Sequence, residues 1–235
     1  MRIIKKSLGI AILLLATQVG FAQLSGTYTI GGTSPKFATI SEAVDSLETY
    51  GVNGAVTLHI RQGNYTEQIS IGKISGTSSS NVVTFKTDPG SSVYSKITYT
   101  SGFVIELKDS VSYINFENLK IEATGSSTKV ISLSGVTSFI TLKKDSLISS
   151  TSGNVIDKPD GIWFKGITIE NNVLIGGRDA ISLYTNQNTL KDTIFSITGN
   201  EMYDFSHEGI TIKNARDGNI EAKLARPFLF IRMCL

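Results

Sequence analysis

Four side chains near the C-terminal end of the chain have the types and the spacing needed for acid–base or cation-binding chemistry. Asp179 and Glu208 are 29 residues apart, and so are Arg178 and His207. If the chain folds into coils of that length, each pair lies on adjacent strands, about 4.8 Å apart. The four side chains then share one patch, with Asp204 in the preceding loop.

Such a patch could serve three kinds of chemistry. Carboxylate oxygens of Asp179, Glu208 and Asp204 could bind Ca²⁺. One carboxylic acid could protonate a glycosidic oxygen while the other acts as a base. Arg178 could hold the carboxylate of a uronic acid. The alternative without a function is a solvated turn region whose charges keep the strand ends soluble.

The segment 161–184 predicts the element that positions these residues. Its sequence, GIWFKGITIENNVLIGGRDAISLY, contains three short runs of alternating apolar and polar residues, separated by Asn-Asn and Gly-Gly. Each run indicates a β-strand, and each dipeptide indicates a turn. Because such strands cannot bury their apolar side alone, the segment predicts one coil of a parallel β-helix, with copies stacked above and below it.

Copies of this coil recur along the chain with a period in the twenties. One set of equivalent strand residues is Phe116, Leu142, Ile169 and Ile197; a second set is Ile131, Ile156, Ile181 and Ile210. The turns after the first set carry Asn118, Asp145, Asn172 and Asn200, which are predicted to form a structural ladder of side-chain hydrogen bonds. A β-sandwich is the alternative fold, but it favours hairpins and does not need this period.

The stretch from about residue 40 to 49 predicts one short α-helix. Thr39 and Glu42 have the spacing of a capping box, and Gly51 is a typical stop residue. The apolar residues fall on one face of this helix. An isolated helix of this length is marginal in water, so we expect it to lie on an apolar surface.

The sequence FATISEAVDSL, followed by GAVTLHIRQGNYTEQISI, resembles the N-terminal cap of the pectin-lyase-like superfamily. GNYTEQISI is similar to the first coil of the pectinesterase and pectate-lyase type proteins. The resemblance covers about residues 26–100 and implies an all-β, right-handed parallel β-helix with a short N-terminal capping α-helix. It extends to large secreted surface proteins of Bacteroidetes-type bacteria.

The catalytic motifs of that superfamily are not found in this sequence. There is no counterpart of the pectinesterase Gln and paired-Asp segments, and Arg226-Pro227-Phe228 only echoes its Arg-Pro-Trp segment. The Asp-Asp and Gly-His-Gly turns of polygalacturonases are also missing. No catalytic role is therefore transferred from the family, and the candidates Asp179, Glu208, His207 and Arg178 depend on their spacing alone.

Residues 1–22 predict an export signal. Arg2, Lys5 and Lys6 precede a short apolar run, and the small residues before Gln23 predict cleavage after Ala22. The alternative is an uncleaved membrane anchor, but the run is short for a span. The net charge of +2 gives no basic field for nucleic acid. We therefore expect a secreted or cell-surface protein with no membrane span after cleavage.

The β-helix domain is predicted over residues 23–223, and an irregular tail over 224–235. From Leu224 onward the alternation stops, and Gly and Asn are absent. Stacked repeats need a polar cap at each end, so we interpret the chain as a truncated version of a longer protein. The alternative is that the tail folds back as an irregular plug.

Three functions stay open at this point. The chain could bind extracellular polysaccharide or cell-surface glycan, serve as a non-enzymatic adhesin or stalk segment, or act as a polysaccharide lyase or glycoside hydrolase. In the last case, the site would lie in the acidic patch or in missing coils. The richness in Ser and Thr and the scarcity of charged clusters favour binding or scaffolding over catalysis. No cofactor is predicted except Ca²⁺ at the acidic patch.

Overall fold

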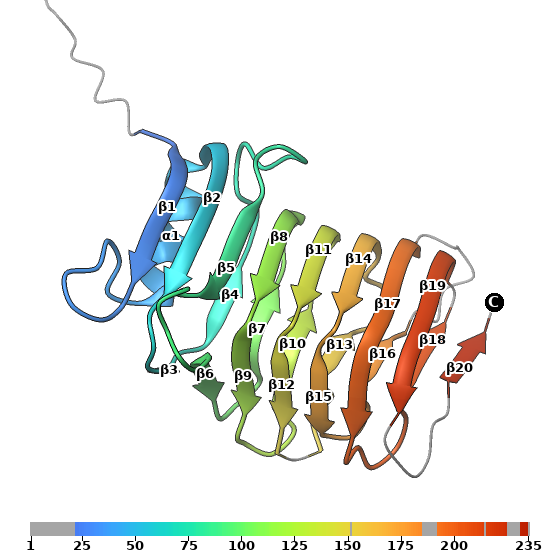
Figure 1. The fold of residues 1–235 in the computed structure, drawn as a ribbon. Helices are drawn as coiled ribbons and strands as arrows, with labels where there is room; N and C mark the ends of the chain where they lie inside the picture. The colour runs from blue at the N-terminus through green and yellow to red at the C-terminus, as the bar shows by residue number, and fades with distance from the viewer. Residues whose placement is uncertain (1–21, 151, 185–191, 214, 225–230, 235) are drawn as a thin grey trace, which may run out of the picture.

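The computed structural model describes residues 22–150, 152–184, 192–213, 215–224 and 231–234. Its strands stack one coil upon the next from β1 to β20, and they build an all-β, right-handed parallel β-helix (Figure 1). The predicted fold class is therefore confirmed. The predicted export signal lies outside the described residues, except for Ala22. No helix among the described residues is long and apolar enough to cross a membrane.

Successive coils contribute strands to three faces. The first face contains β1 (Leu24–Ile30), β2 (Val52–Ile60), β5 (Val83–Thr87), β8 (Val111–Glu117), β11 (Thr137–Lys143), β14 (Phe164–Glu170), β17 (Asp192–Tyr203) and β19 (Ala215–Leu224). The second face contains β3 (Asn64–Thr66), β6 (Ser95–Tyr99), β9 (Leu119–Ala123), β12 (Ser146–Ser149), β15 (Val173–Gly176) and the end of β17. The third face contains β4 (Ile69–Ile71), β7 (Phe103–Leu107), β10 (Lys129–Leu133), β13 (Ile156–Lys158), β16 (Ile181–Leu183), β18 (Ile210–Lys213) and β20 (Ile231–Cys234).

The register of the faces places equivalent apolar residues above one another. Leu142 pairs with Phe116 on one side and with Ile169 on the other. On the third face, the paired residues are Ile131, Ile156, Ile181 and Ile210. Both predicted repeats are confirmed. These side chains point into the stack and are at most 2% exposed, and each fully buried Ile or Leu stabilises the fold by about 1.5–3 kcal/mol.

The first and second faces meet at a turn of one residue in the left-handed conformation. Asn118, Lys144, Asn171 and Gly199 occupy this position in successive coils, with φ between 56° and 65°. Asn tolerates this conformation better than most residues, and Gly adopts it without strain. The chain therefore changes direction between the two faces within a single residue.

The α-helix α1 (Ile40–Tyr50) closes the N-terminal end of the stack. The Thr39 hydroxyl oxygen accepts a hydrogen bond from the Glu42 N–H at 3.1 Å, and the Glu42 carboxylate accepts one from the Ala38 N–H at 2.7 Å. Gly51 ends the helix with φ of 69°, and its N–H donates to the carbonyl of Leu47. The predicted capping helix is therefore confirmed.

The first coil is fastened to this helix by the segment GNYTEQISI. Glu67 accepts hydrogen bonds from the backbone N–H groups of Ile40 at 3.2 Å and Ser41 at 2.9 Å, so its carboxylate caps the N-terminus of α1. The Tyr65 hydroxyl lies 2.8 Å from the carbonyl oxygen of Arg61, to which it donates. Glu67 thus joins the first coil to its cap, and the Tyr65 hydrogen bond lies within the coil.

The C-terminal tail corrects one prediction. We expected residues 224–235 to be irregular, but Leu224 is the last residue of β19 and Ile231–Cys234 forms β20. β20 pairs in parallel with β18, with Ile231 opposite Ile210. The apolar run was not seen as a strand because it lacks the Asn and Gly turn residues that mark the other coils.

Candidate functional site

A ladder of buried polar side chains follows the turn between the first and second faces. Asp145 accepts a hydrogen bond from the Leu119 N–H, Asn172 accepts one from the Asp145 N–H, and Asn200 accepts one from the Asn172 N–H, at 2.8–2.9 Å. The side-chain amides of Asn172 and Asn200 also donate to carbonyls of the first face. These bonds fix the register of the coils, and all three ladder side chains are at most 1% exposed.

Asn118 is not part of this ladder, so its predicted role is corrected. The structure aligns Leu119 with Asp145, and Asn118 with Lys144, at the left-handed turn position. The prediction aligned Asn118 with Asp145 because both are polar turn residues. The actual spacing in this coil is one residue shorter than the spacing assumed.

Asp145 is an acid at a position where the next two coils have Asn. Its Oδ2 atom has no hydrogen-bond partner within the described part of the chain. Burial raises the pKa of Asp145 from 3.8 to about 8. This carboxyl group belongs to the interior, and it has no access to a substrate.

A second ladder precedes the third face, and it contains the predicted Asp179. The Asn154 side chain accepts a hydrogen bond from the Asp179 N–H at 3.3 Å, and Asp179 Oδ1 accepts one from the Glu208 N–H at 3.0 Å. Asp179 therefore lies directly beneath Glu208, and backbone pairing also places Arg178 beneath His207. Asp179 therefore stabilises the stacking of the coils, in addition to any role in chemistry.

Asp179 also orients an imidazole. His207 Nδ1 lies 2.7 Å from Asp179 Oδ1, and Arg178 Nε lies 3.9 Å from Asp179 Oδ2. The Asp179 side chain is 8% exposed, whereas His207 is 51% exposed and Arg178 is 58% exposed. When His207 Nδ1 carries the proton of this bond, Nε2 is left as a base. The buried acid thus orients the exposed imidazole and lies beside the exposed guanidinium.

These residues line a groove of about 420 Å³ on the outer side of the third face, which we call the acidic groove. It crosses the coils of β13, β16 and β18. Its walls are Asn154, Asp157, Lys158, Pro159, Asp160, Arg178, Asp179, Ser182, Tyr184, His207, Glu208 and Thr211. The groove therefore combines four carboxylates with Arg, Lys and His side chains over adjacent coils.

Several charges in the acidic groove already have partners. Asp157 Oδ2 lies 2.6 Å from Lys129 Nζ, and Asp157 Oδ1 accepts a hydrogen bond from the Asn154 amide. Lys158 is buried, and its Nζ donates to the carbonyl of Ile162 at 2.5 Å. Glu208 accepts a hydrogen bond from the Thr211 hydroxyl. A ligand therefore meets a groove whose side chains are fixed in advance.

Asp204 does not line the acidic groove, although it was predicted to lie near Asp179 and Glu208. It is exposed and has φ of 61° in the loop between β17 and β18. Among the described residues, no group of three or more His, Cys, Asp and Glu side chains could hold a metal ion. The predicted set of three Ca²⁺ ligands is thus not assembled.

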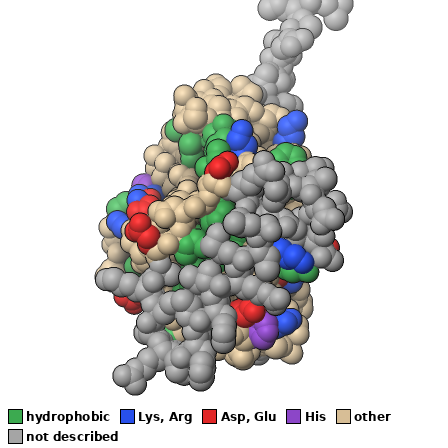
Figure 2. Space-filling view, turned by 90° about the vertical axis from the view of Figure 1, so that its right-hand side faces the viewer, with side chains coloured by type: hydrophobic (Ala, Val, Ile, Leu, Met, Phe, Trp, Pro, Cys, Tyr) green, Lys and Arg blue, Asp and Glu red, His purple; other side chains and the backbone are tan. Residues whose placement is uncertain are grey.

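Sequence reasoning did not identify Asp157, Lys158, Asp160 and Tyr184 as parts of the groove. The pairing of Ile156 with Ile181 placed Asp157 next to Ser182 on the outer side, and this signal was available. The other three residues lie at or beyond the strand ends, where spacing gives no direction. Figure 2, which faces the β20 end, shows charged side chains of both signs and His in separate small groups.

Comparison with known proteins supports the fold. No protein-family model matches the sequence, and no curated protein matches it. Two solved structures of the pectin methylesterase from Aspergillus niger are similar, with TM-scores of 0.51 and 0.52 at 11% and 12% identity. They cover 82% and 83% of this chain, and the chain covers 78% and 77% of them. At this identity the likeness shows a shared parallel β-helix.

A GH136 lacto-N-biosidase from Eubacterium ramulus is similar at a TM-score of 0.49 and 10% identity, over 80% of this chain and 43% of that chain. The fold and the acidic groove together define the chain as a parallel β-helix protein with a charged groove across adjacent coils.

Proposed function

We propose that this chain is an exported β-helix protein that binds an extracellular polysaccharide containing uronic acids in the acidic groove. One observation carries the proposal: the groove gathers carboxylates, Arg178 and His207 over the coils of β13, β16 and β18. A polymer can follow such a groove from coil to coil. The named activity of the fold's neighbours, pectin methylesterase, makes pectic polysaccharides the first ligands to test.

Two exposed basic groups of the groove, Arg178 and His207, can bind the carboxylate of a uronic acid. Arg178 is more than half exposed and can form paired hydrogen bonds with a carboxylate. Lys129 and the Asn154 amide already bind Asp157, so its charge repels the ligand less. Glu208 adds an acceptor for sugar hydroxyl groups.

Acid–base cleavage of the same polysaccharide is the second candidate function, and the 2.7 Å contact between His207 and Asp179 favours it. A carboxylate that orients the imidazole leaves Nε2 free to take a proton from water or from a sugar carbon. A lyase or a hydrolase would use this step, with Arg178 or Glu208 supporting the charge that develops. The absence of superfamily motifs in the sequence leaves binding as the first proposal.

A panel experiment tests both functions. The mature chain from Gln23 is incubated with polygalacturonate, methyl-esterified pectin and neutral galactan, with and without Ca²⁺, while calorimetry measures binding. Ultraviolet absorbance of unsaturated uronates and the release of reducing ends and methanol measure turnover. Uronate binding without turnover supports the first proposal, and turnover abolished in His207→Ala supports the second. A folded chain that binds none of the polymers would leave an adhesin or stalk segment as the remaining function.

A further inference from the structure

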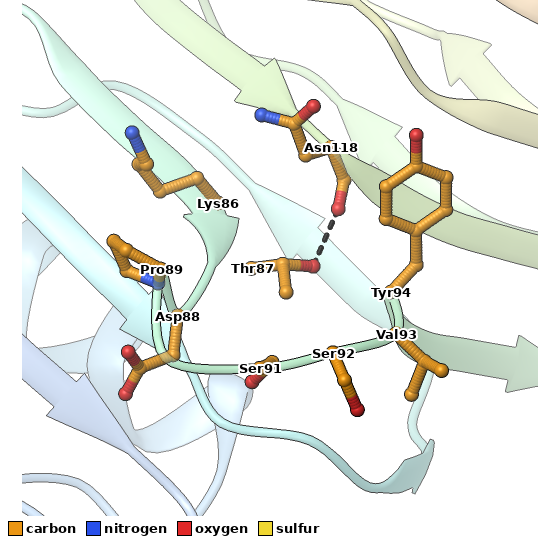
Figure 3. A pocket seen from close by; sticks show the side chains of 9 residues that line it. All are labelled: Lys86, Thr87, Asp88, Pro89, Ser91, Ser92, Val93, Tyr94 and Asn118. Carbon is orange, nitrogen blue, oxygen red and sulfur yellow. Dashed lines mark hydrogen bonds between the residues drawn. The ribbon is translucent and has the colours of Figure 1, made fainter.

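A second cavity lies away from the acidic groove, at the corner between the first and second faces. Its volume is about 640 Å³. It is lined by Lys86, Thr87, Asp88, Pro89, Ser91, Ser92, Val93, Tyr94 and Asn118 (Figure 3). A pocket of this size suits a small ligand.

An inserted loop creates this cavity. Lys86 pairs with Glu117, and Ser95 pairs with Leu119. In the next coil a single residue, Asn118, connects the two faces, whereas this coil has the additional residues 88–94 at the same corner. The loop is not required to close the coil. Figure 3 shows that it passes below Thr87 and places the Tyr94 ring at one end of the cavity, with Lys86 and Pro89 at the other.

The loop is held in a defined conformation. The Thr87 hydroxyl oxygen accepts a hydrogen bond from the Ser95 N–H at 3.0 Å, and Thr87 donates to the carbonyl of Asn118. Asp88 accepts a hydrogen bond from the Gly90 N–H at 3.0 Å. Because these bonds fix the loop before any ligand arrives, binding costs little conformational entropy.

The cavity presents free hydrogen-bonding groups beside an apolar wall. The side chains of Ser91, Ser92, Tyr94 and Asn118 make no hydrogen bond within the described part of the chain. Tyr94 is 48% exposed and Val93 is 53% exposed. An exposed aromatic ring surrounded by unpaired hydroxyl and amide groups matches a sugar ring, which has apolar C–H groups on its face and hydroxyls at its edge.

The charges around the cavity are already balanced. Lys86 Nζ lies 3.7 Å from Glu117 Oε2, and Asp88 Oδ2 lies 3.9 Å from Arg61 Nε. A charged ligand would therefore gain little binding energy from these side chains. We infer that this cavity binds one unit of a neutral sugar chain, with the Tyr94 ring on the sugar face and Asn118, Ser91 and Ser92 at the hydroxyl groups. This site is independent of the function proposed for the acidic groove.

The test titrates the mature chain with maltohexaose, cellohexaose, xylohexaose and a galacto-oligosaccharide, using calorimetry and ligand-observed NMR. At least one of these neutral sugars binds the unmodified chain. Tyr94→Ala and Asn118→Gly each weaken that binding by about five- to tenfold. Asn118→Gly keeps the positive φ of the turn, since Gly occupies the equivalent position 199.

Two control variants distinguish binding in this cavity from binding elsewhere on the chain. Trp163→Ala removes another exposed aromatic ring, at 37% exposure, before β14. Arg178→Ala changes only the acidic groove. Both variants bind the neutral sugar as the unmodified chain does. No binding to any neutral sugar, unchanged binding in Tyr94→Ala and Asn118→Gly, or an equal loss in Trp163→Ala would overturn the inference.

Discussion

Asp179 Oδ1 lies within hydrogen-bond distance of two groups one coil further along, His207 Nδ1 at 2.7 Å and the Glu208 N–H at 3.0 Å. One carboxylate thus holds the backbone of the next coil and orients the imidazole at the wall of the acidic groove. Asp179 links the stacking of the coils to the geometry of the candidate site.

Removal of the Asp179 carboxylate should therefore destabilise the fold. In Asp179→Ala, the Glu208 N–H loses its acceptor in a partly buried position, which lowers the free energy of unfolding by about 1–2 kcal/mol. Asp179→Asn keeps an oxygen acceptor and should lose less than half of that amount. Urea denaturation of the three chains measures the difference. Equal stability of Asp179→Ala and the unmodified chain would show that the hydrogen bond from Glu208 to Asp179 does not contribute to the free energy of unfolding.

Asp145→Asn should stabilise the protein. The amides of Asn172 and Asn200 donate to the carbonyls of Leu142 and Ile169, and the Asn substitution at 145 can donate to the equivalent carbonyl of Phe116. The gain in the free energy of unfolding is about 1–3 kcal/mol at pH 8. Thermal unfolding measured on both chains gives the result, and a lower melting temperature for Asp145→Asn would contradict it.

The same substitution has a defined pH dependence. The pKa of Asp145 rises from 3.8 to about 8 on folding, so the folded chain favours the protonated carboxyl. The associated stability is fully present below pH 3.8 and is lost progressively as the pH rises towards 8. The stability difference between Asp145→Asn and the unmodified chain should therefore grow over this range. A difference that stays constant with pH would show that Asp145 is ionised in the folded chain.

Asn172 should be the most sensitive member of the first ladder. Its side chain accepts from the Asp145 N–H and donates to the carbonyl of Leu142, and it is 1% exposed. Asn172→Ala leaves both backbone groups unpaired and should cost about 2–4 kcal/mol. Asn171→Gly is the matched control, because Asn171 is an exposed neighbour with φ of 56°. A control variant as unstable as Asn172→Ala would show that the loss does not come from the ladder.

The N-terminal cap depends on a carboxylate from the first coil. Glu67→Ala removes the acceptor of the Ile40 and Ser41 N–H groups at the start of α1 and should lower the free energy of unfolding by about 1 kcal/mol. Glu67→Gln keeps an acceptor but loses the charge, so its effect should be smaller. Hydrogen exchange of the α1 amides is the direct measurement. Unchanged exchange in Glu67→Ala would mean that the helix is held by packing alone.

The stacking of the coils could be predicted from the sequence because apolar and charged residues repeat with the same spacing. Ile181 and Ile210 have the same period as the acids Asp179 and Glu208, so one alignment placed both pairs. Asn118 was misplaced because a turn residue and a ladder residue look alike when they are adjacent. The turn residue has a left-handed backbone conformation and the ladder residue does not. Residue spacing in the sequence does not reveal this difference.

Two features could not be predicted from periodicity. The loop 88–94 interrupts the period at a corner, so the spacing of the repeats did not show that it forms a wall of the cavity beside Tyr94. β20 lacks the turn residues that mark the other strands, yet the exposed edge of β18 pairs with it. In both places, neighbouring backbone decides the structure rather than a local pattern.

Calorimetry tests polysaccharide binding in the acidic groove most directly. Polygalacturonate is titrated into the unmodified mature chain, into Arg178→Ala and into Lys165→Ala. Lys165 is an exposed cation on β14 of the first face, so its removal changes the net charge equally. The proposal predicts that Arg178→Ala weakens binding by about tenfold or more, while Lys165→Ala has little effect. Equal effects of the two variants, or no binding by the folded unmodified chain, would contradict polysaccharide binding in the acidic groove.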